Sequence, residues 1–122
     1  MAAKTFCVSL THSHTNTDQA TVGFVVANAA LGCDKDTTVF LSCDGAWIAK
    51  QGEAEKIKEG GPFAPLKDLV DKFMAGGGKL LVCAPCMKKR DITEGQLING
   101  AQVAGGATLV EILSEGTPCV TY

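Results

Sequence analysis

The side chains in this sequence that could do chemistry gather in three short segments. Each segment directly follows a run of β-forming residues. The pairs are His12 with His14, Cys43 with Asp44, and Cys83 with Cys86. A cysteine thiolate is a strong nucleophile, and an imidazole can act as its base or hydrogen-bond partner. These residue types therefore indicate cysteine-based chemistry.

Cys83 is the candidate nucleophile. It ends the apolar run at residues 79–83, and a helical turn expected after it would present unpaired backbone N–H groups and a partial positive charge. Lys88, Lys89 and Arg90 add positive potential within the next two turns. These features favour the thiolate, so the sequence predicts a lowered pKa at Cys83. The alternatives are a buried, unreactive cysteine and, for the basic run, a solvated helix end.

The motif Cys83-Ala-Pro-Cys86 allows two further interpretations. A thioredoxin-like protein carries such a motif between a strand and a helix, but near the beginning of its fold, so the late position here argues against it. A reversible disulfide between the two cysteines is possible on any fold. Together with His12, His14 or Cys43 they could also supply four zinc ligands, although a second closely spaced pair is missing. Otherwise the histidines are polar loop residues, or one of them supports the reactive sulfur.

Strand and helix patterns alternate along the chain and predict the elements that position these residues. The expected strands are residues 5–10, 37–42, 79–83, 101–104 and 118–122. The expected helices are residues 19–31, 66–74 and 107–115, with shorter helical turns at residues 46–50 and 84–90. Thr17 or Asp18 is the expected N-cap of the first helix, and Gly32 is expected just past its end. Residues 51–63 are expected to form a surface segment.

This alternation predicts an α/β fold with a parallel sheet that is covered on both faces. Right-handed crossovers place the loops that follow parallel strands along one edge of the sheet. Ligands of such sheets bind at the carboxyl ends of the strands. We therefore expect the three pairs of reactive residues to converge at this edge.

Length and composition limit the classes of protein to consider. A chain of 122 residues with 46% hydrophobic and 20% charged residues is expected to form one domain, residues 1–122, with a packed core. The net charge of −2 argues against nucleic acid as a partner. The most apolar stretch, residues 22–31, is interrupted at Asn28 and is too short to span a membrane. Without a secretory signal, we expect a cytoplasmic protein whose six cysteines are reduced.

The chain resembles the DsrE/DsrF-like family of small sulfur-relay proteins. The likeness is best over residues 79–122: Leu-Leu-Val-Cys83, the basic segment Met-Lys-Lys-Arg-Asp-Ile at residues 87–92, and Leu-Ile-Asn-Gly-Ala-Gln-Val at residues 97–103. The strand, polar loop and apolar helix of residues 5–31 and the strand end Phe-Leu-Ser-Cys-Asp-Gly at residues 40–45 extend it over nearly the whole chain.

The resemblance implies a three-layer α/β/α domain with a mainly parallel five-stranded sheet. It implies assembly into trimers or hexamers, to which the apolar helix at residues 22–31 could also contribute. It further implies a sulfurtransferase-like carrier that accepts sulfane sulfur on Cys83 as a persulfide and exchanges it with donor and acceptor proteins, without a cofactor. Cys86 departs from the one-cysteine relay pattern, since a nearby thiol could attack the persulfide and release sulfide. The alternatives are a thiol redox protein and a non-catalytic oligomeric module that binds a small ligand or a metal.

Overall fold

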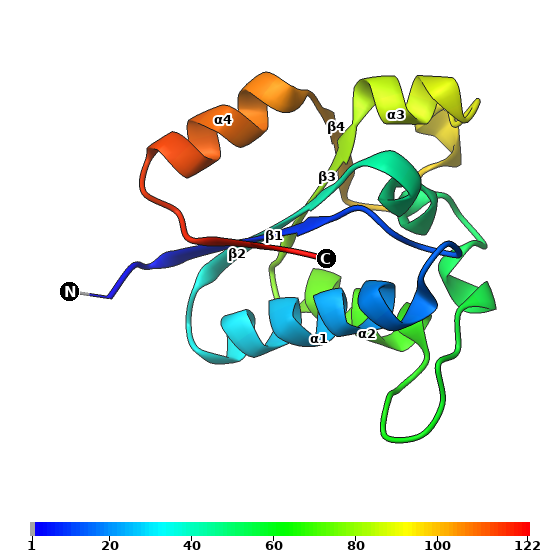
Figure 1. The fold of residues 1–122 in the computed structure, drawn as a ribbon, viewed down its shortest axis with the longest axis horizontal. Helices are drawn as coiled ribbons and strands as arrows, with labels where there is room; N and C mark the ends of the chain where they lie inside the picture. Colours follow the sequence, from blue (N-terminus) through cyan, green and yellow to red (C-terminus); the bar gives the residue numbers. More distant parts are fainter. Residues whose placement is uncertain (1) are drawn as a thin grey trace.

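A computed structural model describes residues 2–122 of the chain, which form a five-stranded sheet in the order β4-β3-β2-β1-β5 (Figure 1). All four neighbouring pairs run parallel. The strands are β1 (Thr5–Leu10), β2 (Asp36–Leu41), β3 (Lys79–Cys83), β4 (Ala101–Ala104) and β5 (Cys119–Thr121). The predicted α/β class and five-stranded sheet are confirmed, and the sheet is wholly parallel.

Helices cover both faces of this sheet and make the three layers (Figure 1). On one face lie α1 (Thr17–Gly32) and α2 (Leu66–Ala75), and on the other lie α3 (Ala84–Lys89) and α4 (Gly106–Ser114). Three short 3₁₀ helices complete the fold: η1 (Cys43–Ala49), η2 (Ala54–Lys56) and η3 (Glu94–Gln96). No helix formed by residues 2–122 is long and apolar enough to cross a membrane.

The main core lies between the sheet and the layer of α1 and α2. Alternate strand residues point into it because successive side chains of a strand face opposite ways. Val8 and Leu10 of β1 are fully buried, and Leu10 packs against Gly23 of α1. Phe24 of α1 meets Phe73 of α2 edge to face, with ring centroids 5.8 Å apart. This packing fixes the sheet on which the reactive loops stand.

Most predicted helices and strands begin and end within two residues of the observed bounds, and the differences at the first helix and at the turn after the second strand have local causes. The first begins at Thr17, and its N-cap is Asn16, whose Oδ1 accepts a hydrogen bond from the Gln19 N–H at 3.1 Å. Neither Thr17 nor Asp18 is the cap, and Gly32 is the last helical residue. The turn predicted at residues 46–50 begins three residues earlier, at Cys43, because the chain bends as soon as β2 ends.

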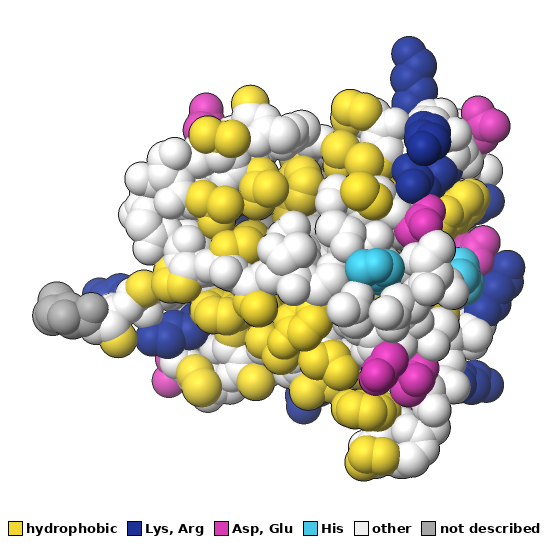
Figure 2. Space-filling view, in the orientation of Figure 1, with side chains coloured by type: hydrophobic (Ala, Val, Ile, Leu, Met, Phe, Trp, Pro, Cys, Tyr) yellow, Lys and Arg dark blue, Asp and Glu magenta, His cyan; other side chains and the backbone are white. Residues whose placement is uncertain are grey.

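The layer of α4 is much looser than the layer of α1 and α2. No residue of α4 is buried, although the helix is rich in apolar residues, and Val110 is 63% exposed. A cavity of about 300 Å³ separates α4 from the amino-terminal ends of the strands and is lined by Thr5, Lys79 and Ile112 among others. Apolar side chains are visible beneath α4 in the space-filling view (Figure 2). This side of the sheet therefore exposes apolar surface.

Candidate functional site

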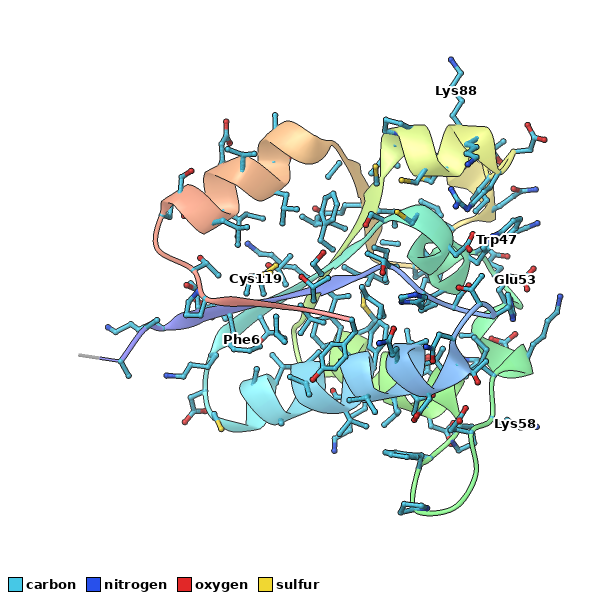
Figure 3. All side chains as sticks on the ribbon, in the orientation of Figure 1. Phe6, Trp47, Glu53, Lys58, Lys88 and Cys119 are labelled. Carbon is cyan, nitrogen blue, oxygen red and sulfur yellow. The ribbon has the colours of Figure 1, made fainter. Side chains whose placement is uncertain are left out.

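The segments that follow β2 and β3 meet at the carboxyl edge of the sheet. The two strands are in register, with Leu41 opposite Val82, so Cys43 and Cys83 leave the sheet side by side. The backbone N–H of Cys43 donates a hydrogen bond to Sγ of Cys86 at 3.1 Å. Sulfur atoms gather beneath α3 at this edge (Figure 3). Cys43, Cys83 and Cys86 thus form one group of thiols, named here the thiol cluster.

A sharp bend after β2 brings Cys43 to this group. Cys43 has a left-handed backbone with φ of 51°, which few residues other than glycine adopt. Gly45 then passes so close to β1 that a Cβ atom at this position would overlap the carbonyl oxygen of Leu10. That oxygen also accepts a hydrogen bond from the Ser42 N–H at 3.1 Å. The absence of a side chain at Gly45 therefore allows η1 to lie against the end of β1.

Cys83 is the last residue of β3, caps α3 and is half-buried. Burial raises the pKa of the Cys83 thiol above its ordinary value of 9.0, and the Cys86 thiol adds to this increase through a hydrogen bond. The nearby backbone N–H of Cys86 acts to lower the pKa of Cys83, but by less. The predicted lowered pKa at Cys83 is therefore wrong.

The basic residues after Cys83 do not offset this desolvation. Arg90 is paired with Asp44: its Nε donates to Oδ1 of Asp44 at 3.0 Å, and its Nη2 lies 2.9 Å from the same oxygen. Its Nη1 also donates to the Cys86 carbonyl at 3.1 Å. Lys88 and Lys89 are exposed, and Lys88 extends away from the protein (Figure 3). Arg90 and Asp44 therefore join α3 to η1 and hold the thiol cluster together.

The two histidines make contacts of their own. His12 Nδ1 lies 3.1 Å from Oγ1 of Thr11, and His14 Nε2 lies 3.3 Å from Oε2 of Glu53. Burial acts to raise the pKa of Glu53, but the hydrogen bonds and charges of Lys56 and His14 outweigh it and lower that pKa. Within residues 2–122 no hydrogen bond joins either histidine to a sulfur atom. Glu53 was not predicted as the partner of His14, because nothing in its local sequence distinguishes it from other surface acids.

The remaining cysteines lie away from the thiol cluster. Cys33 is exposed at the end of α1, at the opposite edge of the sheet. Cys7 of β1 is fully buried and lies in register with Cys119 of β5, which is on the side of the sheet that faces α4 (Figure 3). Burial and the neighbouring Cys119 thiol raise the pKa of Cys7 to about 12. Cys7, Cys33 and Cys119 can therefore serve as control positions in experiments on the thiol cluster.

The structure gives the zinc interpretation no ligand set. In the part of the chain from residue 2 to residue 122, no three His, Cys, Asp or Glu side chains are arranged to hold a metal ion. All six cysteines are free thiols. The contact of the Cys43 backbone with Cys86 and the closeness of both residues to Cys83 suit the cluster to reactions in which sulfur–sulfur bonds form and break.

Comparison with known proteins supports the resemblance seen in the sequence. The sequence model of the DsrE/DsrF-like family matches residues 4–122. The chain is 35% identical over 100 residues to the uncharacterized protein MJ0760 of Methanocaldococcus jannaschii, covering 82% of this chain and 36% of that protein. It therefore spans about a third of the length of this relative. The uncharacterized protein MJ0989 of the same organism is 27% identical over 117 residues, which cover 96% of this chain and 98% of that protein.

Solved structures share the fold at low sequence identity. The ychN protein of E. coli has a TM-score of 0.78 at 16% identity, covering 97% of this chain and 99% of that protein. The protein of unknown function MTH1491 from Methanobacterium thermoautotrophicum has a TM-score of 0.70 at 14% identity, covering 96% and 97%. These similarities confirm the predicted fold and leave the chemistry to be argued from the thiol cluster.

Proposed function

Because the chain belongs to the DsrE/DsrF-like family, we propose that it carries sulfane sulfur as a persulfide on Cys83 and passes it from a donor protein to an acceptor protein. The main support is the position of Cys83 at the end of β3, half-buried and next to Cys86. A half-buried sulfur is open to a partner thiol, while its surroundings limit the access of water and competing thiols.

The contacts of Cys83 support storage of sulfur better than rapid spontaneous reaction. Its raised pKa keeps the free thiol protonated at neutral pH, and thiols react through the thiolate. The backbone N–H of Cys86 can donate to negative charge on the sulfur once the proton has left. In this proposal the Cys83 thiol reacts with suitable sulfur donors and reacts slowly with weak electrophiles.

The assignment can be tested by mass spectrometry after incubation with glutathione persulfide. Trypsin releases residues 80–88, which hold Cys83 and Cys86, separately from residues 36–50, which hold Cys43. We expect a persulfide, an added mass of about 32 Da, on the peptide of residues 80–88 in the wild type and in the control variant Cys33→Ser. The adduct should be lost from this peptide in Cys83→Ser. If Cys83→Ser keeps it there, Cys83 is not the carrier.

A second candidate function is thiol redox chemistry at Cys83 and Cys86, favoured by the closeness of the two thiols, which is enough for the Cys86 thiol to raise the pKa of Cys83. In this reaction the Cys86 thiolate attacks the inner sulfur of the Cys83 persulfide, a disulfide forms and HS⁻ leaves with the electron pair. The two cysteines are oxidised and the sulfane sulfur is reduced to sulfide. Sulfide release coupled to a loss of two hydrogens from residues 80–88 would indicate this function. A persulfide that lasts equally long in the wild type and in Cys86→Ser would exclude it.

We also propose that the protein forms homo-oligomers, trimers or hexamers. The exposed apolar face of α4 supports this, because exposed apolar surface of this kind commonly marks a protein interface. Light scattering of Val110→Glu tests this face, and Val25→Glu tests the other predicted contributor, α1, whose exposed valine lies on the opposite side of the sheet. We expect only the first variant to reduce the molar mass. A monomeric wild type at micromolar concentration would refute assembly.

The free cysteines are the support for our proposal that the protein works in the cytoplasm. No disulfide joins any of the six within residues 2–122, and reducing compartments keep thiols free. Rapid acid quenching of cells followed by alkylation should find all six thiols free when no sulfur donor is supplied. Stable disulfides in the quenched protein would contradict this location.

A further inference from the structure

Cys43 is the most accessible sulfur-bearing residue of the thiol cluster. It is exposed, whereas Cys83 and Cys86 are half-buried. Its backbone N–H donates to Sγ of Cys86, and it lies close enough to Cys83 to contribute to the raised pKa of that thiol. A donor molecule that approaches this edge of the sheet can therefore reach Cys43 more easily than Cys83.

The backbone at Cys43 is unusual for a residue with a side chain. Its φ of 51° lies in the left-handed region, which is unfavourable for residues other than glycine and which asparagine tolerates better than most. A purely structural bend would be made more favourably by glycine or asparagine. Strained residues of this kind tend to occur at functional sites. A thiol in this conformation, next to two others, therefore requires a chemical explanation.

We propose that Cys43 is the entry thiol of the relay, which takes the sulfane sulfur from the donor and hands it to Cys83. This inference rests on the proposed function of Cys83 as the carrier. It assigns a reactive role to the Cys43 thiol. The hydrogen bond from the Cys43 backbone N–H to Cys86 would by itself give Cys43 only a structural role. The donor is the persulfide of a peptide or a protein cysteine, which reaches the exposed Cys43 more easily than the half-buried Cys83.

The two steps exchange sulfur without net oxidation. In the first, the Cys43 thiolate attacks the terminal sulfur of the donor R–S–SH, the donor S–S bond breaks and R–S⁻ leaves with the electron pair. In the second, the Cys83 thiolate attacks the terminal sulfur of the Cys43 persulfide and Cys43 leaves as a thiolate. The proton given up by Cys83 passes to Cys43, so both residues return to their starting forms except that Cys83 holds the sulfur.

The surroundings of the cluster suit this direction of transfer. The pair of Arg90 and Asp44 holds η1 against α3, so Cys43 stays beside Cys86 and Cys83 while the sulfur moves. The leaving thiolate of Cys43 forms at an exposed position, where water stabilises its charge, whereas a charge on half-buried Cys83 is less well solvated. The stored sulfur therefore ends at the more protected position.

The test is a time course of sulfur loading with glutathione persulfide, quenched by alkylation and read on the two tryptic peptides. The variant is Cys43→Asn, because asparagine adopts the left-handed backbone and lacks the thiol. Cys33→Asn is the matched control, since it makes the same change at an exposed cysteine far from the cluster. The alkylation rate of Cys83 with a small reagent checks that Cys43→Asn leaves the site intact.

In the wild type, the added mass should appear first on residues 36–50 and later on residues 80–88. Cys43→Asn should slow the loading of Cys83 by about tenfold with unchanged alkylation, Cys33→Asn should not, and Cys83→Ser should trap the sulfur on Cys43. Loading of Cys83 at the wild-type rate in Cys43→Asn would overturn the entry role and leave Cys83 as the carrier. A wild type in which Cys83 never gains sulfur would overturn the proposed function, and the entry role with it.

Discussion

Replacement of Gly45 with alanine should separate η1 from the end of β1 and disturb the thiol cluster from a distance. The new Cβ would overlap the carbonyl oxygen of Leu10 and lie 3.0 Å from its carbonyl carbon and 3.5 Å from Cα of Thr11. All three are backbone atoms, which cannot rotate away as a side chain can. The carbonyl is also fixed by its hydrogen bond from Ser42. Relief of the overlap therefore requires that the segment from Ser42 onward moves outward.

This movement lowers the free energy of unfolding of the Gly45→Ala protein. Forcing extra volume into a packed backbone contact costs about 1–3 kcal/mol. The displaced segment also carries the Cys43 N–H, whose hydrogen bond to Sγ of Cys86 at 3.1 Å would lengthen. A loss of about 2 kcal/mol lowers the melting temperature of a 122-residue domain by about 8 °C. We expect this shift together with faster alkylation of Cys86.

The assay pairs thermal unfolding with timed alkylation of the peptide of residues 80–88. Gly32→Ala is the control, because it adds the same methyl group to a helical glycine with no atom within 4 Å of the new Cβ. That variant should melt at the wild-type temperature or slightly above it, since alanine favours a helix. If Gly45→Ala melts like the wild type and alkylates at the same rate, the bend after β2 does not depend on the missing side chain, and the reasoning is wrong.

Three further predictions concern charge and pH. Arg90→Gln should lower the free energy of unfolding by about 1 kcal/mol in urea titrations and speed alkylation of Cys86, because it weakens the partly exposed link to Asp44. The control is Lys88→Gln at an exposed position, and equal values in the two variants would contradict the prediction. The free energy of unfolding should fall by about 1 kcal/mol between pH 9 and pH 10, because the unfolded Cys7 thiol loses its proton above its ordinary pKa of 9.0 while the folded thiol keeps it up to about pH 12. A Cys7→Ala protein whose stability falls equally over this range would disprove the prediction. The rate of sulfur loading on Cys83 from a small polysulfide should rise with pH up to and beyond pH 9, because only the thiolate attacks and burial raises the pKa of the Cys83 thiol above its ordinary 9.0. A rate that levels off below pH 8 would show that Cys83 is more acidic than its burial implies.

The sequence alone determined the elements of the fold and their order. Strand and helix patterns depend on neighbouring residues, so the strands at residues 79–83 and 101–104 agree with β3 and β4 to the residue. The parallel arrangement followed from their alternation with helices, and the family resemblance was confirmed over residues 4–122. The largest error in an element's start arose where a turn depends on a distant segment: η1 begins at Cys43, and Gly45 within it packs on β1.

The tertiary structure decided which reactive residues meet and what charge they experience. The pairs Cys43 with Cys86 and Asp44 with Arg90 join residues more than 40 positions apart, so no local pattern reveals them. The same is true of His14 and Glu53, which form a separate contact. The predicted acidity of Cys83 was wrong for this reason. Nearby cations in the sequence favoured a thiolate, but in the fold Arg90 is neutralised by Asp44, the lysines face solvent, and burial decides the direction of the shift.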